Sequence, residues 1–460
     1  MVDVTPGTAA DPTAPAPGPI GLKRVLNTRD LIVYGIMMMF PLAPVAVYGA
    51  VQQQTGGHLF LAYLIAMVAM LFTALSYGAM AGAFPRAGST YTFTRNGLSP
   101  HLGLLSGWAI TLDYVLFPTL NMILLGLFAS AQWPSIHYWW WVVAAVIVVT
   151  FFNLREVRWL ARISAVLLLV SLVVVAWFIG AAVHTLNGGT GAGTVFSMKP
   201  IFNAASFRWS PLFAGTAVAC FSFLGFDAIS TLAEETKRPA RAVSLATVSS
   251  LLLITGLFLV QVYFSALLIP NADKLTNPNT AFYQIFGVAG GSTLSTVLTV
   301  ALIAACLANA IASLGGASRL LYGMGRDGVI PKKVFGYLWP KSQTPVLNVM
   351  LIAVLTLIGA GRNLNQIINM INFGALLAFF LVNISMANHF FVREHRRTGF
   401  QAVRYLIAPV LGAGVIIWLW FHLSHSAWEV GGTWLGLGII YMLFKTNFFR
   451  KPLPEFTGQV

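Results

Sequence analysis

Charged side chains are scarce in this chain, and their scarcity excludes a water-soluble globular protein. Only 9% of the 460 residues are Asp, Glu, Lys or Arg, whereas 57% are hydrophobic. A soluble domain has roughly 25% charged residues, which cover its surface. The composition therefore predicts an integral membrane protein.

Patterns of catalytic and metal-binding residues are also lacking. Neither H-E-x-x-H nor G-x-S-x-G occurs, and no histidine is spaced with Cys or Glu as a metal ligand inside an apolar segment. The only two cysteines, Cys220 and Cys306, lie within such segments and are expected to pack as small hydrophobic side chains. We expect no enzyme activity, no cofactor and no metal site.

Long apolar segments are abundant instead, and about 20 residues suffice to cross a bilayer as a helix. Twelve are found, near residues 30–53, 59–83, 103–130, 138–155, 160–184, 211–235, 244–270, 292–323, 346–361, 364–390, 404–424 and 432–448. The sequence predicts an all-α integral membrane protein with twelve transmembrane helices.

A net charge of +14 is also found in nucleic-acid-binding proteins, but here the positions of the basic residues indicate a membrane topology. Once the spans are drawn, all Lys and Arg residues lie on one side except Lys199, Arg208, Lys274 and Arg362. Basic loops stay in the cytoplasm. We expect a multi-pass protein of the bacterial plasma (inner) membrane, in contact with lipid, with both termini cytoplasmic and no nucleic-acid partner.

The order of the spans predicts two halves. Residues 1–25 are proline-rich and expected to form a disordered cytoplasmic tail. Five spans in 26–185 and five in 211–390 are interpreted as inverted repeats, because an odd number of spans reverses the orientation of the second half. We interpret 186–210 as a glycine-rich external linker, 391–448 as two further helices and 449–460 as a second cytoplasmic tail.

Two apolar segments are interrupted at corresponding points of the halves, at residues 37–44 and 221–227. Unwound backbone is tolerated at membrane depth where it lines a cavity, so paired breaks indicate a transporter's central site. The first break contains Pro41, Leu42, Ala43 and Pro44 and no glycine. Because proline lacks an N–H group, this break offers carbonyl acceptors and suits a cation better than a carboxylate.

Two acidic residues, Asp113 and Asp227, lie well within the predicted spans, and no Lys or Arg occupies a span centre. A charge at bilayer depth is costly and tends to mark function. Such carboxyl groups can be protonated or can pair with an ammonium group, so both are candidates for substrate binding and proton coupling. The alternatives are a helix-capping role for Asp227 and a hydrogen bond from Asp113 to a neighbour's broken backbone.

Other candidate substrate contacts are aromatic or polar. Tyr114, Phe221 and Phe226 are placed to close over a cation or a methylene chain, with core packing as the alternative. The polar candidates are Ser222, Asn309 and Asn372, for which interhelical hydrogen bonding is equally compatible, and Gly225 is a candidate because it lies at the second break. We interpret Glu234 and Glu235 as part of a surface ion-pair network, and residues 281–288 as a short helix that is either a lid or a connection.

Several motifs resemble the amino acid, polyamine and organocation (APC) superfamily. They are residues 84–91, residues 225–227 with 234–241, and residues 318–327. Four further stretches, 112–114, 221–228, 334–337 and 371–376, are most similar to bacterial putrescine importers. Unlike some of these importers, the chain has no acidic residue at 43–48.

The resemblance implies a five-plus-five inverted-repeat fold with a substrate site between helices 1, 3, 6, 8 and 10. It also implies secondary transport without ATP, usually proton-coupled, and a gating role for a carboxylate at Asp227. We expect a proton-coupled importer of putrescine or a related polyamine that works by alternating access. The alternatives are an amino acid permease or amino acid/amine exchanger of the same fold and, from another class, a channel or receptor.

Overall fold

The computed structural model describes residues 26–85, 89–154, 160–204, 206–271, 274–326, 328, 330–339 and 344–447. Both predicted tails lie outside these ranges. Over the described residues the chain is almost entirely helical, and its one β-bridge joins Leu26 to Thr236. All twelve predicted apolar segments are helical there, which confirms an all-α, multi-span architecture.

The first half contains seven helical elements. They are α1 (Thr28–Met38), α2 (Pro44–Gln54), α3 (Leu59–Ala83), α4 (Ser89–Gly97), α5 (Pro100–Gln132), α6 (Tyr138–Asn153) and α7 (Leu160–Asn187). Thus α1 and α2 are the two parts of the broken first span. The short α4, which the spans did not predict, precedes α5.

The second half repeats the pattern of a broken helix followed by long ones. Its elements are α8 (Trp209–Ala219), η1 (Cys220–Phe223), η2 (Phe226–Glu235), α9 (Pro239–Leu268), η4 (Pro278–Thr280), α10 (Ala281–Arg326), α11 (Lys332–Phe335), α12 (Val346–Gly359) and α13 (Leu364–Met386). The chain then continues through η5 (Ala387–Arg393), α14 (Phe400–Ala402), η6 (Val403–Ile407), α15 (Ala408–Phe421) and α16 (His425–Lys445).

The lengths and the apolar composition of the helices fit a membrane protein. Among the described residues, nine helices are long and apolar enough to cross a bilayer, while α6 and α12 are shorter apolar helices. Large side chains such as Ile147, Ile358 and Ile440 are more than half exposed on the outside of the bundle. Apolar side chains on an outer surface are what lipid contact requires.

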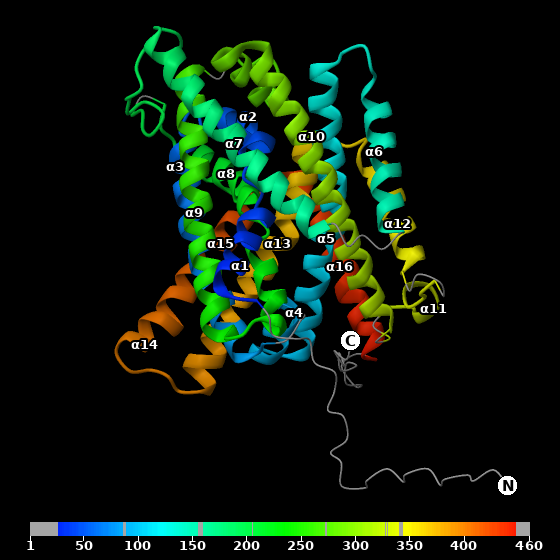
Figure 1. The fold of residues 1–460 in the computed structure, drawn as a ribbon. Coiled ribbons are helices and arrows are strands. Elements are labelled where there is room, and N and C mark those ends of the chain that lie inside the picture. The colour runs from blue at the N-terminus through cyan, green and yellow to red at the C-terminus, as the bar shows by residue number, and fades with distance from the viewer. Residues whose placement is uncertain are drawn as a thin grey trace, which may run out of the picture.

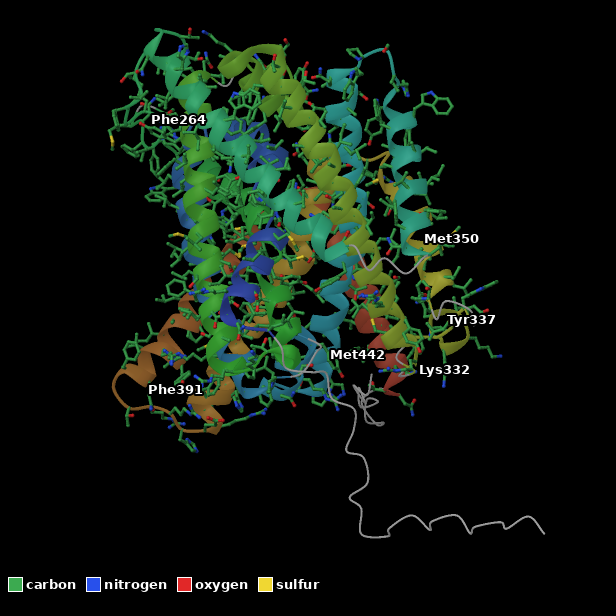
Figure 2. The ribbon with its side chains drawn as sticks, in the orientation of Figure 1. Phe264, Lys332, Tyr337, Met350, Phe391 and Met442 are labelled. Carbon is green, nitrogen blue, oxygen red and sulfur yellow. The ribbon has the colours of Figure 1, made fainter. Side chains whose placement is uncertain are left out.

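The helices form one bundle of upright elements (Figure 1). The start of α1 and the end of α16 lie at its lower end, together with α11 and α14. In Figure 2, Lys332 and Phe391 lie at this end and Phe264 lies at the opposite one. The end that carries Lys332 is the one predicted to be cytoplasmic.

Helix α5 holds the first candidate acid and is shaped by its prolines. The Ser99 hydroxyl accepts a hydrogen bond from the Leu102 N–H and caps the helix, and Pro100 occupies its first turn. Pro118, inside the helix, has no N–H to donate to the carbonyl oxygen of Tyr114 one turn earlier. A carbonyl acceptor is therefore released next to Asp113.

Helix α10 contains a bend that the sequence indicated as two separate apolar runs. Gly290 and Gly291 interrupt it, and Gly291 has φ 68° and ψ −164°, a conformation that is essentially restricted to glycine. The predicted short helix at 281–288 is thus confirmed as a helix. It lies against α2, where Phe282 makes an edge contact with Tyr48 at 5.2 Å between ring centroids.

Candidate substrate site at the two helix breaks

The first break separates α1 from α2 and contains a residue in an unusual conformation. Phe40 has φ 55°, which is rare for a bulky residue and costs about 1–3 kcal/mol. The chain is held partly by a local bond from the Ala43 N–H to the Phe40 carbonyl, at 2.8 Å. The predicted break at Pro41, Leu42 and Ala43 is therefore confirmed as non-helical backbone between two short helices.

A side chain from α9 supports this break. The Gln261 amide nitrogen donates to the carbonyl oxygens of Pro41 at 2.9 Å and Leu257 at 3.2 Å. Gln261 is fully buried, and its own amide oxygen has no partner among the described residues. The Gln261 amide nitrogen thus gives a hydrogen bond to the Pro41 carbonyl group, which lies in the break outside the regular helical hydrogen bonds.

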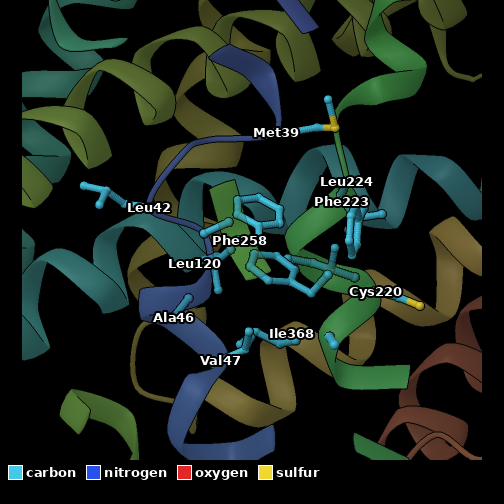
Figure 3. Packing of buried hydrophobic residues seen from close by; sticks show 14 of the residues in the cluster. Met39, Leu42, Ala46, Val47, Leu120, Cys220, Phe223, Leu224, Phe258 and Ile368 are labelled. Carbon is cyan, nitrogen blue, oxygen red and sulfur yellow. The ribbon is translucent and has the colours of Figure 1, made fainter. Parts of the chain in front are cut away.

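The second break lies between η1 and η2. Leu224 is extended, with ψ 142°, and Gly225 has φ 108°. A Cβ atom on Gly225 would lie 2.7 Å from the carbonyl oxygen of Met38. The two breaks therefore touch, and Figure 3 shows Met39 beside Leu224 where they face each other.

Asp227 lies at the start of η2 and is buried. The backbone N–H groups of Asp227 itself, Gly225 and Ala228 lie close to its carboxylate. The positive end of a helix also favours a carboxylate there. Asp227 therefore lies at the junction of the two breaks, and its helix-capping role stays a prediction beside the substrate role.

Asp113 differs because one of its carboxylate oxygens has no partner in the part of the chain that the structure describes. The residue is only 8% exposed, and its Oδ1 atom has no hydrogen-bond partner among the described residues. Asp227 lies close enough for the two carboxylates to repel each other, and Tyr77 and Tyr114 lie within electrostatic range of both. No described basic side chain pairs with either acid.

Aromatic contacts lie on both sides of the acids. Phe226 is fully buried and packs against Tyr77 at 5.6 Å and Phe379 at 5.1 Å between centroids. Tyr77 also contacts Phe93 at 5.7 Å, so these four residues form an inner aromatic cluster. Phe226 thus has the core-packing role that was its alternative.

On the other side of the acids, Phe221 faces Phe117 at 6.3 Å between ring centroids. Phe117 lies one turn beyond Asp113 along α5, whereas the inner aromatic cluster includes Phe93 on α4, before α5 begins. Tyr114 is only partly buried. Phe221 thus packs against Phe117 and Phe226 against the inner aromatic cluster, and a substrate-lining role for Tyr114, Phe221 and Phe226 stays a prediction.

Two predicted polar contacts are engaged in bonds between helices. The Ser222 hydroxyl is 2.8 Å from the Tyr63 hydroxyl, and the Asn372 amide nitrogen donates to the Ala217 carbonyl at 3.0 Å. The amide oxygen of Asn372 is buried without a partner among the described residues. Ser222 thus makes the interhelical hydrogen bond that was its alternative role. Asn372 makes such a bond as well, but its amide oxygen has no partner among the described residues.

Asn309 lies on a small cavity beside the first break. The cavity has a volume of about 50 Å³ and is lined by Met37, Met38, Phe40, Pro41, Leu168, Ser171, Ala305, Ala308, Asn309 and Ala312. Its lining includes neither Asp113 nor Asp227. Ligand pockets are usually about 300–1,000 Å³, so this space suits a few water molecules rather than an organic substrate.

Sequence reasoning missed Gln261 and Tyr77. The sequence could have identified Gln261, because a lone amide side chain in the middle of an apolar helix indicates a hydrogen bond to another helix. Nothing in the sequence singled out Tyr77, since it is one of many aromatic residues in the spans.

The predicted ion pairs of Glu234 and Glu235 lie outside the described side chains. Within the described chain, no group of three or more His, Cys, Asp or Glu side chains is placed to hold a metal ion.

Comparison with known proteins places this chain in a family. The family model described as amino acid permease matches residues 30–425. The low-affinity putrescine importer PlaP of Escherichia coli K12 is 35% identical over 455 residues, covering 99% of this chain and 98% of the importer. The branched-chain amino acid permease BcaP of Bacillus subtilis is 25% identical, covering 95% of this chain and 96% of the permease.

A mammalian relative extends the comparison to cationic substrates. The cationic amino acid transporter 4 of Mus musculus is 28% identical over 391 residues, covering 79% of this chain and 59% of the transporter. The family match covers most of the chain, including both helix breaks and both buried acids. The chain therefore belongs to the amino acid permease family, a family of membrane transport proteins within the APC superfamily.

Proposed function

We propose that this protein is a secondary active transporter that imports putrescine or a related polyamine together with protons. The observation that carries the proposal is the pair Asp113 and Asp227. These two buried carboxyl groups lie beside the contact between the helix breaks and have no basic partner among the described residues. The full-length similarity to a putrescine importer supports the same substrate class.

An ammonium group would relieve the repulsion between the two acids. Charge-assisted bonds from ammonium to carboxylate are among the stronger hydrogen bonds in proteins. When no substrate is bound, a proton on one carboxyl group has the same effect, because two neighbouring buried carboxylates disfavour joint ionisation. Binding of substrate and binding of protons are thereby linked, which is the basis of the proposed coupling.

Alternating access would use the aromatic contacts on the two sides of the acids as gates. The inner aromatic cluster would separate for release to the cytoplasm, and the Phe117–Phe221 pair for entry from outside. The two halves, 26–185 and 211–390, would rock as inverted repeats joined by the external linker 186–210. In this scheme both termini are cytoplasmic, and the bundle is surrounded by lipid of a bacterial inner membrane.

Amino acid transport by the same fold is the second candidate, and the relation to BcaP favours it. A zwitterionic substrate needs backbone N–H donors for its carboxylate. At the second break, the backbone N–H groups of Gly225 and Ala228 already lie close to the Asp227 carboxylate. At the first break, Pro41 and Pro44 have no N–H to offer. The geometry therefore favours an amine.

Uptake of radiolabelled putrescine by the purified protein in proteoliposomes tests the proposal. With the lumen more alkaline than the outside, we would expect to see accumulation that collapses when a protonophore is added. Protein-free liposomes control for leakage. If no diamine or polyamine is accumulated under this gradient, while an amino acid is, the second candidate replaces the first.

A further inference from the structure

An open groove of about 530 Å³ lies between the start of α9 and η6, away from the helix breaks. We call it the arginine groove, and its lining residues are Ala240, Arg241, Ser244, Leu245, Val248 and Arg404. It lies at the lower end of the bundle, where α14 projects beside the foot of α9 in Figure 1. Two arginines on different elements thus meet in one groove.

The charge of the arginine groove is not compensated within the described chain. Arg241 and Arg404 are exposed, and neither forms an ion pair with a described carboxylate. The nearest described acid on the segment before η6, Glu394, pairs with Arg396 and His389. The Arg404 guanidinium lies 5.4 Å from the ring centre of Tyr405, which restricts its position. As far as the described side chains go, two planar, positively charged groups therefore remain for an outside partner.

Apart from Ser244, the remainder of the groove is apolar, and apolar side chains continue from it along the outer surface of the bundle. Leu245 is 52% exposed one helical turn from Arg241, and Leu253 is 59% exposed two turns further along α9. On the other side, Val403 and Ile407 are 46% and 48% exposed beside Arg404. A ligand in this place meets positive charge at one end and hydrocarbon-facing side chains at the other.

We propose that the arginine groove binds the headgroup phosphate of an anionic phospholipid from the cytoplasmic leaflet. Arginine recognises phosphate through paired N–H donors, and Ser244 adds a hydroxyl group. The exposed leucines and valines lie where the acyl chains of such a lipid would run. Basic pockets at the cytoplasmic edge of membrane helices bind acidic headgroups in this way. A cationic substrate is excluded, because the arginines repel it.

Native mass spectrometry of the delipidated full-length protein in detergent tests the proposal. The probes are phosphatidylglycerol, phosphatidylcholine and inorganic phosphate. We would expect to see preferential retention of phosphatidylglycerol by the unmodified protein, and about thirtyfold weaker binding in the double variant R241Q/R404Q, since each basic contact contributes about fivefold. The double variant K332Q/K333Q removes the same charge from exposed α11 and should bind like the unmodified protein.

Two results would overturn the proposal in this experiment. One is equal binding of phosphatidylglycerol by R241Q/R404Q and the unmodified protein. The other is complete displacement of the lipid by millimolar phosphate, which would make the groove a site for a free anion. If R241Q/R404Q does not fold, the proposal is tested by crosslinking a photoactivatable phosphatidylglycerol to the unmodified protein. Its crosslinks should fall within 240–248 or 403–407, and crosslinks confined to other helices would reject the site.

Discussion

Replacing Asp227 with Asn is expected to abolish putrescine uptake and leave the protein folded. The substitution removes a negative charge that the proposed mechanism uses for both ammonium and proton. Losing one partner of a buried, hydrogen-bonded charge pair costs about 2–5 kcal/mol. Uptake should therefore fall at least about thirtyfold in proteoliposomes.

The matched control for this substitution is Glu429→Gln. Glu429 lies on α16, and its exposed carboxylate is 3.2 Å from His425. Removing that charge should leave uptake unchanged, because exposed pairs contribute about 1 kcal/mol or less. Thermal unfolding of both variants shows whether they are folded. Full uptake by a folded Asp227→Asn protein would exclude this carboxyl group from transport.

Replacing Gly225 with Ala is expected to destabilise the whole carrier. Gly225 has φ 108°, a left-handed conformation in which a Cβ atom is strained by about 1–3 kcal/mol. The added atom would also lie 2.7 Å from the carbonyl oxygen of Met38, a backbone group that cannot rotate away. Overpacking of this kind costs about 1–3 kcal/mol more. The unfolding temperature and the uptake rate should both fall.

Gly256→Ala is the control for that substitution. Gly256 lies inside α9 and is exposed, and a Cβ atom added to it would have open space for 4 Å around it. Alanine favours a helix over glycine by about 1 kcal/mol, so stability should stay the same or rise slightly. If Gly225→Ala unfolds at the same temperature as Gly256→Ala and transports normally, the two breaks do not need their close contact.

The broken helices could be predicted from the sequence because the interrupting residues are themselves the cause. Pro41 and Pro44 cannot continue a helical ladder, and Gly225 supplies the positive φ at the second break. The paired Gly290 and Gly291 likewise mark the bend in α10. These signals are local, so one chain read by itself is sufficient to locate them.

The contacts that build the site could not be predicted in this way, because they join residues far apart in the chain. Gln261 and Pro41 are separated by 220 positions, and Ser222 and Tyr63 by 159. The pattern of apolar residues along the chain does not indicate that the two residues of either pair lie in contact. The packing of Phe226 could not be predicted for the same reason: its position next to Asp227 suggested a substrate contact, and only the fold shows that Tyr77 and Phe379 enclose its ring.

Asp113 and Asp227 show what the sequence leaves open even where it identifies the residues. Two acids without basic neighbours in the spans were enough to nominate a cation site. Only the fold shows that Asp227 lies beside backbone N–H groups and that Asp113 keeps a free oxygen. The pair thus combines the Asp227 carboxylate, beside backbone N–H groups, with the Asp113 carboxylate, of which one oxygen has no described partner.

An experimental structure of the protein with bound putrescine tests most directly whether this pair receives an amine. We predict an ammonium nitrogen within about 2.7–3.2 Å of a carboxylate oxygen of Asp113 or Asp227. The methylene chain should lie between Tyr114 and Phe221. A diamine bound elsewhere, with both carboxyl groups turned away from it, would contradict the account.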